Sequence, residues 1–150
     1  MSTVYLGADH AGFDMKQIIR DHLDSRGVIV EDLGAHALDP RDDYPEYARA
    51  VATAVREHPG SFGILGCGNA EGVMIAANKF DGIRAGLGFS VDAAVTMRQD
   101  DNANVLCVPG RIATDDDPLM IVDAFLATAF SNGERHNRRL SAITKIEEHN

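Results

Sequence analysis

The chain has 150 residues, 45% of them hydrophobic, so it can bury the core of one domain without disulfides or metal ions. Acidic residues outnumber basic ones by 23 to 14 and the net charge is −9, which argues against binding of nucleic acid or an anionic membrane through overall charge. The two cysteines, Cys67 and Cys107, fit neither a zinc spacing nor a redox pair. With no basic leader and no long apolar run, the sequence predicts one cytoplasmic domain, residues 1–150.

The predicted elements alternate between strands and helices. Short apolar runs predict five strands, at residues 4–6, 28–30, 62–65, 83–87 and 105–108. Apolar residues at helical spacing predict a first helix that ends at Gly27, and further helices at 44–57, 73–79, 91–99, 118–130 and 136–148. Such alternation is typical of βαβ units, so we predict an α/β fold with a parallel sheet.

Ligands of open parallel sheets bind beyond the carboxyl ends of the strands. The positions that directly follow the first, third and fifth predicted strands are therefore the first candidates for a site. They hold Asp9-His10, the glycine-rich turn at 66–72, and Gly110-Arg111.

The turn at 66–72 has glycines at positions 66, 68 and 72. These let backbone N–H groups point inward at the amino end of the next helix, where they can bind an anion, although a plain tight connection has the same pattern. The spacing differs from the dinucleotide fingerprint, and no Lys-Ser or Lys-Thr follows to make a P-loop. The turn therefore gives little support for a nucleotide cofactor.

Two residues of this turn are candidate general bases. Cys67 lies near a helix amino end, which favours the thiolate, although a free cysteine is more often a small buried apolar residue. Glu71, four residues later, can abstract a proton next to a carbonyl, or can simply stabilise the helix dipole. The residues alone leave the choice between them open.

Two further groups of polar residues are candidates for substrate binding. Asp9 and His10 can clamp a sugar hydroxyl, or can serve as a helix cap with a solvated neighbour. Arg135 and Arg139 share a helix face and suit phosphate oxygens, although a basic face often only pairs with acidic neighbours. Their occurrence beside His136, in an acidic chain with an anion-binding turn, favours phosphate, and Arg111 is a further candidate.

The sequence resembles the type B ribose-5-phosphate isomerases and the related galactose-6-phosphate isomerase subunits, nearly from end to end. The resemblance is carried, in order, by residues 7–13, 43–45, 66–68, 75–79, 82–85, 102–106, 110–111 and 135–139. It implies a Rossmann-like three-layer α/β/α fold with a five-stranded parallel sheet. It also implies a homodimer with active sites shared between subunits, a tetramer being the alternative, and neither metal nor organic cofactor.

The resemblance also implies roles for individual residues. Cys67 would take the carbon-bound proton, with Glu71 in reserve because one branch of the family uses a glutamate on this turn. Isomerisation also needs donors for the developing oxyanion and a charged handle for orientation. The implied substrate-binding residues are Asp9 and His10 for the sugar, Gly68, Asn69, Ala70 and Gly72 for the enediolate, Tyr44 for the pocket wall, and Arg111, Arg135, His136 and Arg139 for phosphate.

The chain departs from this family pattern at Asp100-Asp101, where pentose-specific members carry His-Asn and the histidine helps to open the furanose ring. Asp100 would have to replace it, and Asp101 is a further substrate-binding candidate. A carboxyl group with an ordinary pKa is ionised at neutral pH and is therefore a poor proton donor, unless burial raises its pKa. Ribose 5-phosphate is the first substrate we expect, with a tetrose 4-phosphate, which cannot close a furanose, or a hexose 6-phosphate as alternatives. A non-catalytic sugar-phosphate sensor is the alternative of another class.

Overall fold

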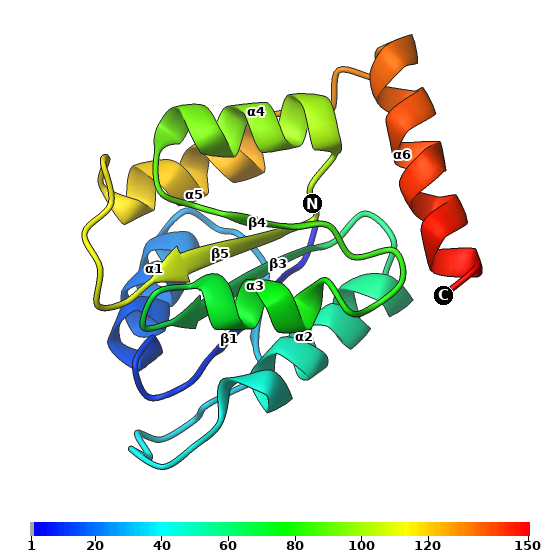
Figure 1. The fold of residues 1–150 in the computed structure, drawn as a ribbon. Helices are drawn as coiled ribbons and strands as arrows, with labels where there is room; N and C mark the ends of the chain where they lie inside the picture. Colours follow the sequence, from blue (N-terminus) through cyan, green and yellow to red (C-terminus); the bar gives the residue numbers. More distant parts are fainter. Residues whose placement is uncertain (1) are drawn as a thin grey trace.

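Five strands and six helices make up the protein in a computed structural model that describes residues 2–150. Strands and helices alternate up to β5, and the chain ends with two helices (Figure 1). The strands are β1 (Val4–Ala8), β2 (Val30–Asp32), β3 (Phe62–Cys67), β4 (Ala85–Leu87) and β5 (Val105–Pro109). The helices are α1 (Phe13–Ser25), α2 (Tyr44–Glu57), α3 (Glu71–Ala77), α4 (Val91–Asp101), α5 (Pro118–Ala127) and α6 (Glu134–Glu148).

The five strands form one parallel sheet in the order β2-β1-β3-β5-β4, so the predicted fold class and sheet are confirmed. The central strand β3 has β1 on one side and β5 on the other. Its register pairs Ala8 with Gly66 and Cys67 with Pro109. The carboxyl ends of β1, β3 and β5 therefore lie side by side.

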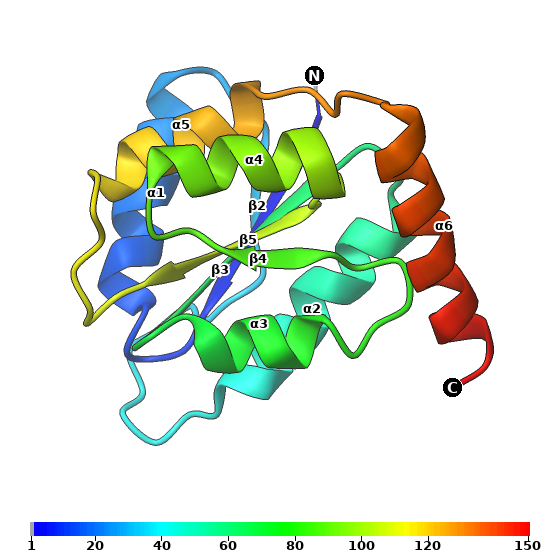
Figure 2. The same cartoon turned by 45° about the horizontal axis from the view of Figure 1, so that its top comes forward.

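Helices cover both faces of the sheet and make three layers. Helices α2 and α3 lie on one face, and α1, α4 and α5 lie on the other (Figures 1 and 2). Val51 and Leu65 belong to the apolar cluster of the first face, and Leu6 and Phe125 to that of the second. All four are fully buried. Each such side chain contributes about 1.5–3 kcal/mol relative to an exposed one, so both layers stabilise the sheet that carries the strand ends.

Two strands start later than their apolar runs predict. The run at 28–30 gives a strand only from Val30, because the Val28 N–H donates to the Leu23 carbonyl and closes the end of α1. The run at 83–87 gives a strand only from Ala85, because the Ile83 N–H donates to the Phe80 carbonyl in a turn. In both places a local turn takes the backbone hydrogen bonds that a strand would use.

Helix boundaries also move by two or three residues from those predicted. Helix α3 begins at Glu71 rather than 73, since the Asn69 side chain accepts the Glu71 N–H and so starts the helix. Helix α5 ends at Ala127 rather than 130, because Thr128 has extended backbone angles. Helix α6 begins at Glu134, two residues before the predicted start.

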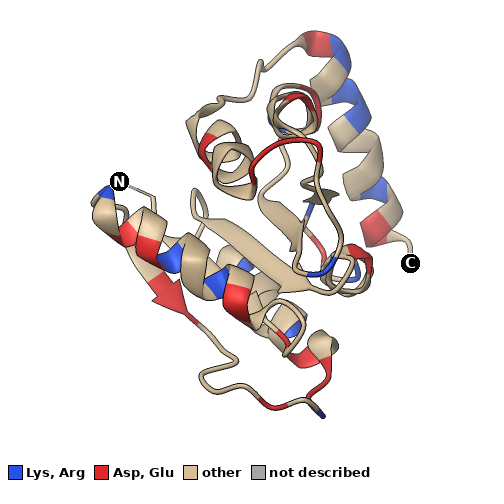
Figure 3. Ribbon diagram, turned by 90° about the vertical axis from the view of Figure 1, so that its left-hand side faces the viewer, with Lys and Arg blue, Asp and Glu red and all other residues tan. Residues whose placement is uncertain are grey.

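Helix α6 lies beyond one end of the sheet and packs mainly near α4 (Figures 1 and 2). Its first half carries several basic residues, drawn blue in Figure 3. Ile143 and Ile146 on this helix are exposed. None of the helices within residues 2–150 has the length and apolar character needed to cross a membrane.

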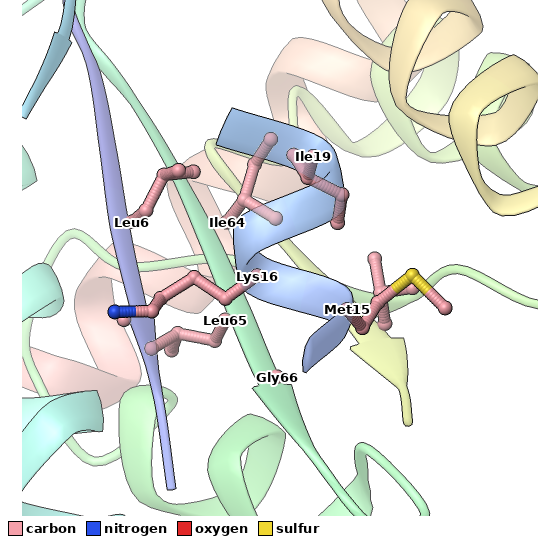
Figure 4. Close-up of a pocket in the computed structure, with 9 residues that line it drawn as sticks. Leu6, Met15, Lys16, Ile19, Ile64, Leu65 and Gly66 are labelled. Carbon is pink, nitrogen blue, oxygen red and sulfur yellow. The ribbon is translucent and has the colours of Figure 1, made fainter. Parts of the chain in front are cut away.

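A small internal cavity of about 10 Å³ lies between α1 and the sheet (Figure 4). The Lys16 side chain lies along its wall, and its Nζ is 2.7 Å and 2.9 Å from the two carboxylate oxygens of Asp32. The cavity has an apolar surface and room for about one water molecule. We therefore assign it to core packing and look for the site at the edge of the sheet.

Candidate active site

Three loops meet at the carboxyl edge of the sheet, as parallel strands require. The Gly110 N–H donates to the Cys67 carbonyl at 2.8 Å, and the Arg111 N–H donates to the Gly68 carbonyl at 3.0 Å. On the other side of β3, the Asp9 N–H donates to the Gly66 carbonyl at 3.4 Å. The three segments that the sequence singled out are therefore direct neighbours in space.

This close approach depends on glycine at two positions. A Cβ atom on Gly110 would lie 2.1 Å from the Ala11 carbonyl oxygen, and one on Gly12 would lie 2.5 Å from the Gly66 carbonyl carbon. Real Cβ atoms do not approach backbone atoms so closely, and backbone cannot move aside as a flexible side chain can. These glycines let the loop after β1 lie directly against those after β3 and β5.

The loop after β1 carries the predicted pair Asp9 and His10. Asp9 is buried, and its Oδ1 accepts the N–H groups of Ala11 and Gly12 at 3.0 Å and 3.2 Å. The Asp9 carboxylate therefore fixes the turn that leads into α1. His10 is partly exposed beside it, so the ring can reach a ligand at this edge of the sheet.

Asp42 and Tyr47 hold this loop in place, and neither is among the residues predicted from the sequence. Asp42 Oδ1 lies 2.9 Å from the His10 backbone N and 2.8 Å from the His10 ring Nδ1. The Tyr47 hydroxyl donates to Asp42 Oδ2 at 3.0 Å. Burial raises the pKa of the Asp42 carboxyl, but the hydrogen bonds from His10 and Tyr47 outweigh it, so the net pKa is below the ordinary value. The only sequence signal was the Asp-rich loop that precedes α2.

The turn after β3 presents Cys67 and several free backbone donors. Cys67 is buried, and its thiol donates to Asn69 Oδ1 at 3.7 Å. The backbone N–H groups of Gly68, Asn69 and Ala70 donate to no other part of the described chain. Ala70 has a left-handed backbone, with φ of 65°, immediately before α3. A turn of this kind with unpaired amides can accept an oxyanion.

The second cysteine has a different environment. Cys107 lies in the middle of β5 and is completely buried. Burial, together with the nearby Cys67, raises the pKa of the Cys107 thiol, so this thiol stays protonated. Cys107 is a core residue, as its apolar strand indicated.

Tyr44 and Glu71 also lie at this edge. A Cβ atom on Gly72 would lie 2.7 Å from the Tyr44 ring, so the ring packs directly over the start of α3. Tyr44 is 38% exposed and can form one wall of a pocket over the turn. Glu71 is in the first turn of α3 with an exposed side chain, whereas Cys67 is buried at the end of the strand.

The remaining predicted residues, apart from Arg111, lie at the opposite edge of the sheet. Helix α4 returns toward the amino ends of the strands, where the Arg84 side chain, just before β4, donates to the Asp101 carbonyl. Oδ1 of Asp100 lies 3.4 Å from Nε2 of His136 on α6, and Arg135 donates to the same nitrogen at 3.3 Å. In Figure 1 the arrowhead of β5 points away from α6.

The predicted residues therefore do not all meet at one place within a single chain. Arg111 lies at the edge with Cys67, and its Cδ would be 3.7 Å from a Cβ on Gly68. Arg135 and Arg139 are exposed on α6 at the far edge, beside Asp100 and His136. The reason is topological: helices that follow parallel strands run back across the sheet, so the end of α4 and the start of α6 are remote from the strand exits.

One group of side chains has the composition of a metal site. A nitrogen of His10 and carboxylate oxygens of Asp9 and Asp42 lie within 4.8 Å of one another, the one such group in residues 2–150. However, His10 and Asp42 are bonded to each other, and Asp9 is bonded to backbone N–H groups. This mutual pairing explains their proximity, since opposite partners satisfy buried polar groups.

Comparisons with known proteins identify the family of the chain. The sequence profile of the family described as Ribose/Galactose Isomerase matches residues 4–143. The chain is 44% identical over 144 residues to ribose-5-phosphate isomerase B of Mycobacterium tuberculosis, covering 96% of this chain and 89% of that protein. It is 43% identical over 148 residues to the Escherichia coli enzyme of the same name, covering 99% and 98%.

A solved structure gives the same result in three dimensions. The crystal structure of ribose-5-phosphate isomerase B from Mycoplasma genitalium with bound ribulose-5-phosphate superimposes with a TM-score of 0.93 at 42% identity. The match covers 99% of this chain and 97% of that one. Sequence and fold agree, and the chain belongs to the ribose/galactose isomerase family of aldose–ketose isomerases.

Proposed function

We propose that this chain interconverts ribose 5-phosphate and ribulose 5-phosphate through an enediolate, with Cys67 as the base. The observation that carries the proposal is that a buried thiol, the Asp9-His10 loop and a turn of unpaired amides meet at one sheet edge. Ribulose-5-phosphate bound to the Mycoplasma genitalium relative supports the choice of substrate. We expect the reaction to take place in the cytoplasm and without a metal or cofactor.

The proposed reaction needs one base and one set of oxyanion donors. The Cys67 thiolate removes the proton from C2 of the open-chain aldose, the C–H electrons form a C1=C2 double bond, and O1 becomes negatively charged. The N–H groups of Gly68, Asn69 and Ala70 donate to O1. The new thiol then returns its proton to C1 while C2–O becomes the carbonyl and the O2 proton moves to O1. Glu71 is the alternative base.

The sugar hydroxyls fall to the loop after β1. Asp9 uses Oδ1 on backbone N–H groups, which leaves Oδ2 to accept from a hydroxyl. His10 uses Nδ1 on Asp42, which leaves Nε2 for the substrate. Tyr44 forms the wall above the turn. These groups hold C1 and C2 beside the thiol, and such positioning contributes a large part of the rate in reactions of this kind.

The phosphate group requires a second copy of the chain in this proposal. Arg111 is the only arginine of the predicted set at the Cys67 edge, whereas Arg135 and Arg139 are exposed at the other edge, beside the buried His136. If a two-fold dimer brings the α6 edge of one subunit to the Cys67 edge of its partner, symmetry makes the same contact at the second site. The exposed Ile143 and Ile146 on α6 support contact with such a partner.

A tetrose 4-phosphate is the second candidate substrate. The observation that favours it is Asp100, which stands where pentose-specific relatives carry a ring-opening histidine. A tetrose 4-phosphate needs no ring opening. However, His136 lies 3.4 Å from Asp100, so an imidazole is still present at this place and keeps the pentose as first choice.

The test is isotope exchange in deuterated water with three separate substrates: ribose 5-phosphate, erythrulose 4-phosphate and galactose 6-phosphate. We expect deuterium at the carbon next to the carbonyl and the highest kcat/KM with ribose 5-phosphate, both unchanged after treatment with EDTA. A higher kcat/KM with the tetrose or the hexose would mean that this sugar phosphate, and not ribose 5-phosphate, is the preferred substrate. Tight binding without exchange for all three would identify a sensor.

A further inference from the structure

We propose that Asp42 is a positioning residue of the substrate site, which holds the His10 ring through Nδ1 so that Nε2 is the nitrogen presented to the sugar phosphate. Tyr47 in turn holds Asp42. The inference rests on the proposed function in one respect, because it takes His10 to be a substrate-binding residue. Neither Asp42 nor Tyr47 touches the substrate in this proposal.

Asp42 makes two contacts with His10, one with its backbone and one with its ring. One oxygen, Oδ1, lies 2.9 Å from the His10 backbone N and 2.8 Å from its ring Nδ1. The two residues are 32 positions apart in the chain, so this contact joins the loop after β1 to the segment before α2. The Asp42 side chain is only 6% exposed. Both the backbone and the ring of His10 are therefore fixed from the same atom.

The Asp42–His10 contact determines which ring nitrogen remains available. An ionised carboxylate only accepts hydrogen bonds, so the shared proton is on Nδ1 whether the ring is neutral or charged. Nε2 is then the nitrogen that gains or loses a proton. It accepts a hydrogen bond from a hydroxyl in the neutral ring and donates one to an anionic oxygen in the charged ring. Without the carboxylate, either tautomer of the neutral ring is possible and the ring is free to turn.

Tyr47 keeps Asp42 in this state. Its hydroxyl donates to Oδ2 at 3.0 Å, which orients the carboxylate so that Oδ1 faces His10. Burial and the hydrogen bond to Asp42 raise the pKa of Tyr47 to about 12, so the hydroxyl remains a donor at any physiological pH. The hydrogen bonds from His10 and Tyr47 outweigh burial and keep the pKa of Asp42 below its ordinary value, so the carboxyl is ionised.

The neighbouring Asp9 fixes the other side of the same loop. Its Oδ1 accepts the Ala11 and Gly12 N–H groups, so one carboxylate holds the backbone after His10 and another holds His10 itself. A loop held in this way is ordered before the substrate arrives. Binding then loses less free energy to ordering, which is the physical benefit that a positioning residue supplies.

The test compares four variants of the full-length protein. Asp42→Ala removes the acceptor, Asp42→Asn keeps an oxygen but removes the charge, and Tyr47→Phe removes the outer hydrogen bond. Glu46→Gln is the matched control, because Glu46 is exposed on the same helix, is close enough to influence Tyr47, and makes no hydrogen bond within the described residues. Steady-state kcat and KM are measured with ribose 5-phosphate, and the His10 tautomer is measured by nitrogen-15 NMR.

We expect Asp42→Ala to lower kcat/KM by about 10–100-fold, the range known for losing the carboxylate partner of a metal-binding histidine, with the Nδ1–H tautomer no longer dominant. Compared with Asp42→Ala, Asp42→Asn should recover part of the kcat/KM and part of the Nδ1–H tautomer. Tyr47→Phe should change both quantities less than Asp42→Ala does, and Glu46→Gln should change neither. Wild-type kinetics for Asp42→Ala, or an unchanged His10 tautomer in it, would overturn the inference. If the wild type turns over no sugar phosphate, the proposed function fails, but the NMR measurement still tests the tautomer.

Discussion

Nε2 of His136 lies 3.4 Å from Oδ1 of Asp100, at the edge of the sheet opposite Cys67. Arg135 approaches the same nitrogen at 3.3 Å, and one nitrogen cannot accept from Arg135 and donate to Asp100 at once. Nε2 without a proton therefore accepts from Arg135, and Nε2 with a proton donates to Asp100. This group of charges is assembled before any partner arrives, and it cannot serve the Cys67 of its own chain.

The shared site predicts that two inactive variants complement each other. Cys67→Ala lacks the base and Arg139→Gln lacks a phosphate ligand, so each homodimer is inactive. When the two are mixed, unfolded and refolded together, a mixed dimer has one site with both residues intact. We expect roughly a quarter of all sites to recover, because isologous symmetry combines near edge and far edge from different chains. The measurement is the rate of ribulose 5-phosphate formation.

The control for complementation is the Cys67→Ala/Arg139→Gln double variant mixed with either single variant. No site in those mixtures has both residues intact, so no activity should return. If the mixture of single variants also stays inactive while light scattering shows that the co-refolded protein is dimeric, the two residues act in the same subunit or not at all. A monomer by light scattering in fully active wild-type protein would also contradict the shared site.

Cys67 is predicted to be essential for turnover and not for binding. Replacement by alanine removes the base, and general-base catalysis contributes about 10²–10⁴-fold, so kcat should fall by at least that range while the dissociation constant for the sugar phosphate stays within a few fold. Glu71→Gln is the comparison, since Glu71 is exposed on the same turn. Should Glu71→Gln lose turnover and Cys67→Ala keep it, the base is Glu71.

The sequence predicted the parts of the site that depend on local order along the chain. Apolar runs located the ends of β1, β3 and β5 to within one or two residues, and parallel topology then places Asp9, Cys67 and Arg111 together. Asp42 was missed because its role depends on a contact 32 residues away, which no spacing rule describes. Which subunit's site Arg139 serves was left open by the sequence, because it depends on where the last helix packs.

Gly110→Ala is predicted to destabilise the protein and the site together. The new Cβ would lie 2.1 Å from the Ala11 carbonyl oxygen, so the loops after β1 and β5 must separate. Such overpacking costs about 1–3 kcal/mol. Gly60→Ala is the matched control: Gly60 has φ of +89° with open space around it, so only backbone strain of about 1–2 kcal/mol applies. Urea denaturation measures the loss of unfolding free energy in both variants. Only Gly110→Ala should also raise the KM for ribose 5-phosphate.

The last prediction concerns acid stability. Asp42 has a folded-state pKa below its ordinary value of 3.8, so folding favours its ionised form. The stability that it contributes is fully present above pH 3.8 and is lost as the pH falls through the lower, folded-state pKa. Asp42→Asn should therefore have a lower urea midpoint than the wild type at pH 7, and the difference should shrink in acid below pH 3.8. For Glu46→Gln, the difference in urea midpoint from the wild type should not shrink in acid. A difference for Asp42→Asn that stays constant or widens as acid is added would mean that the carboxylate is not held ionised by His10 and Tyr47.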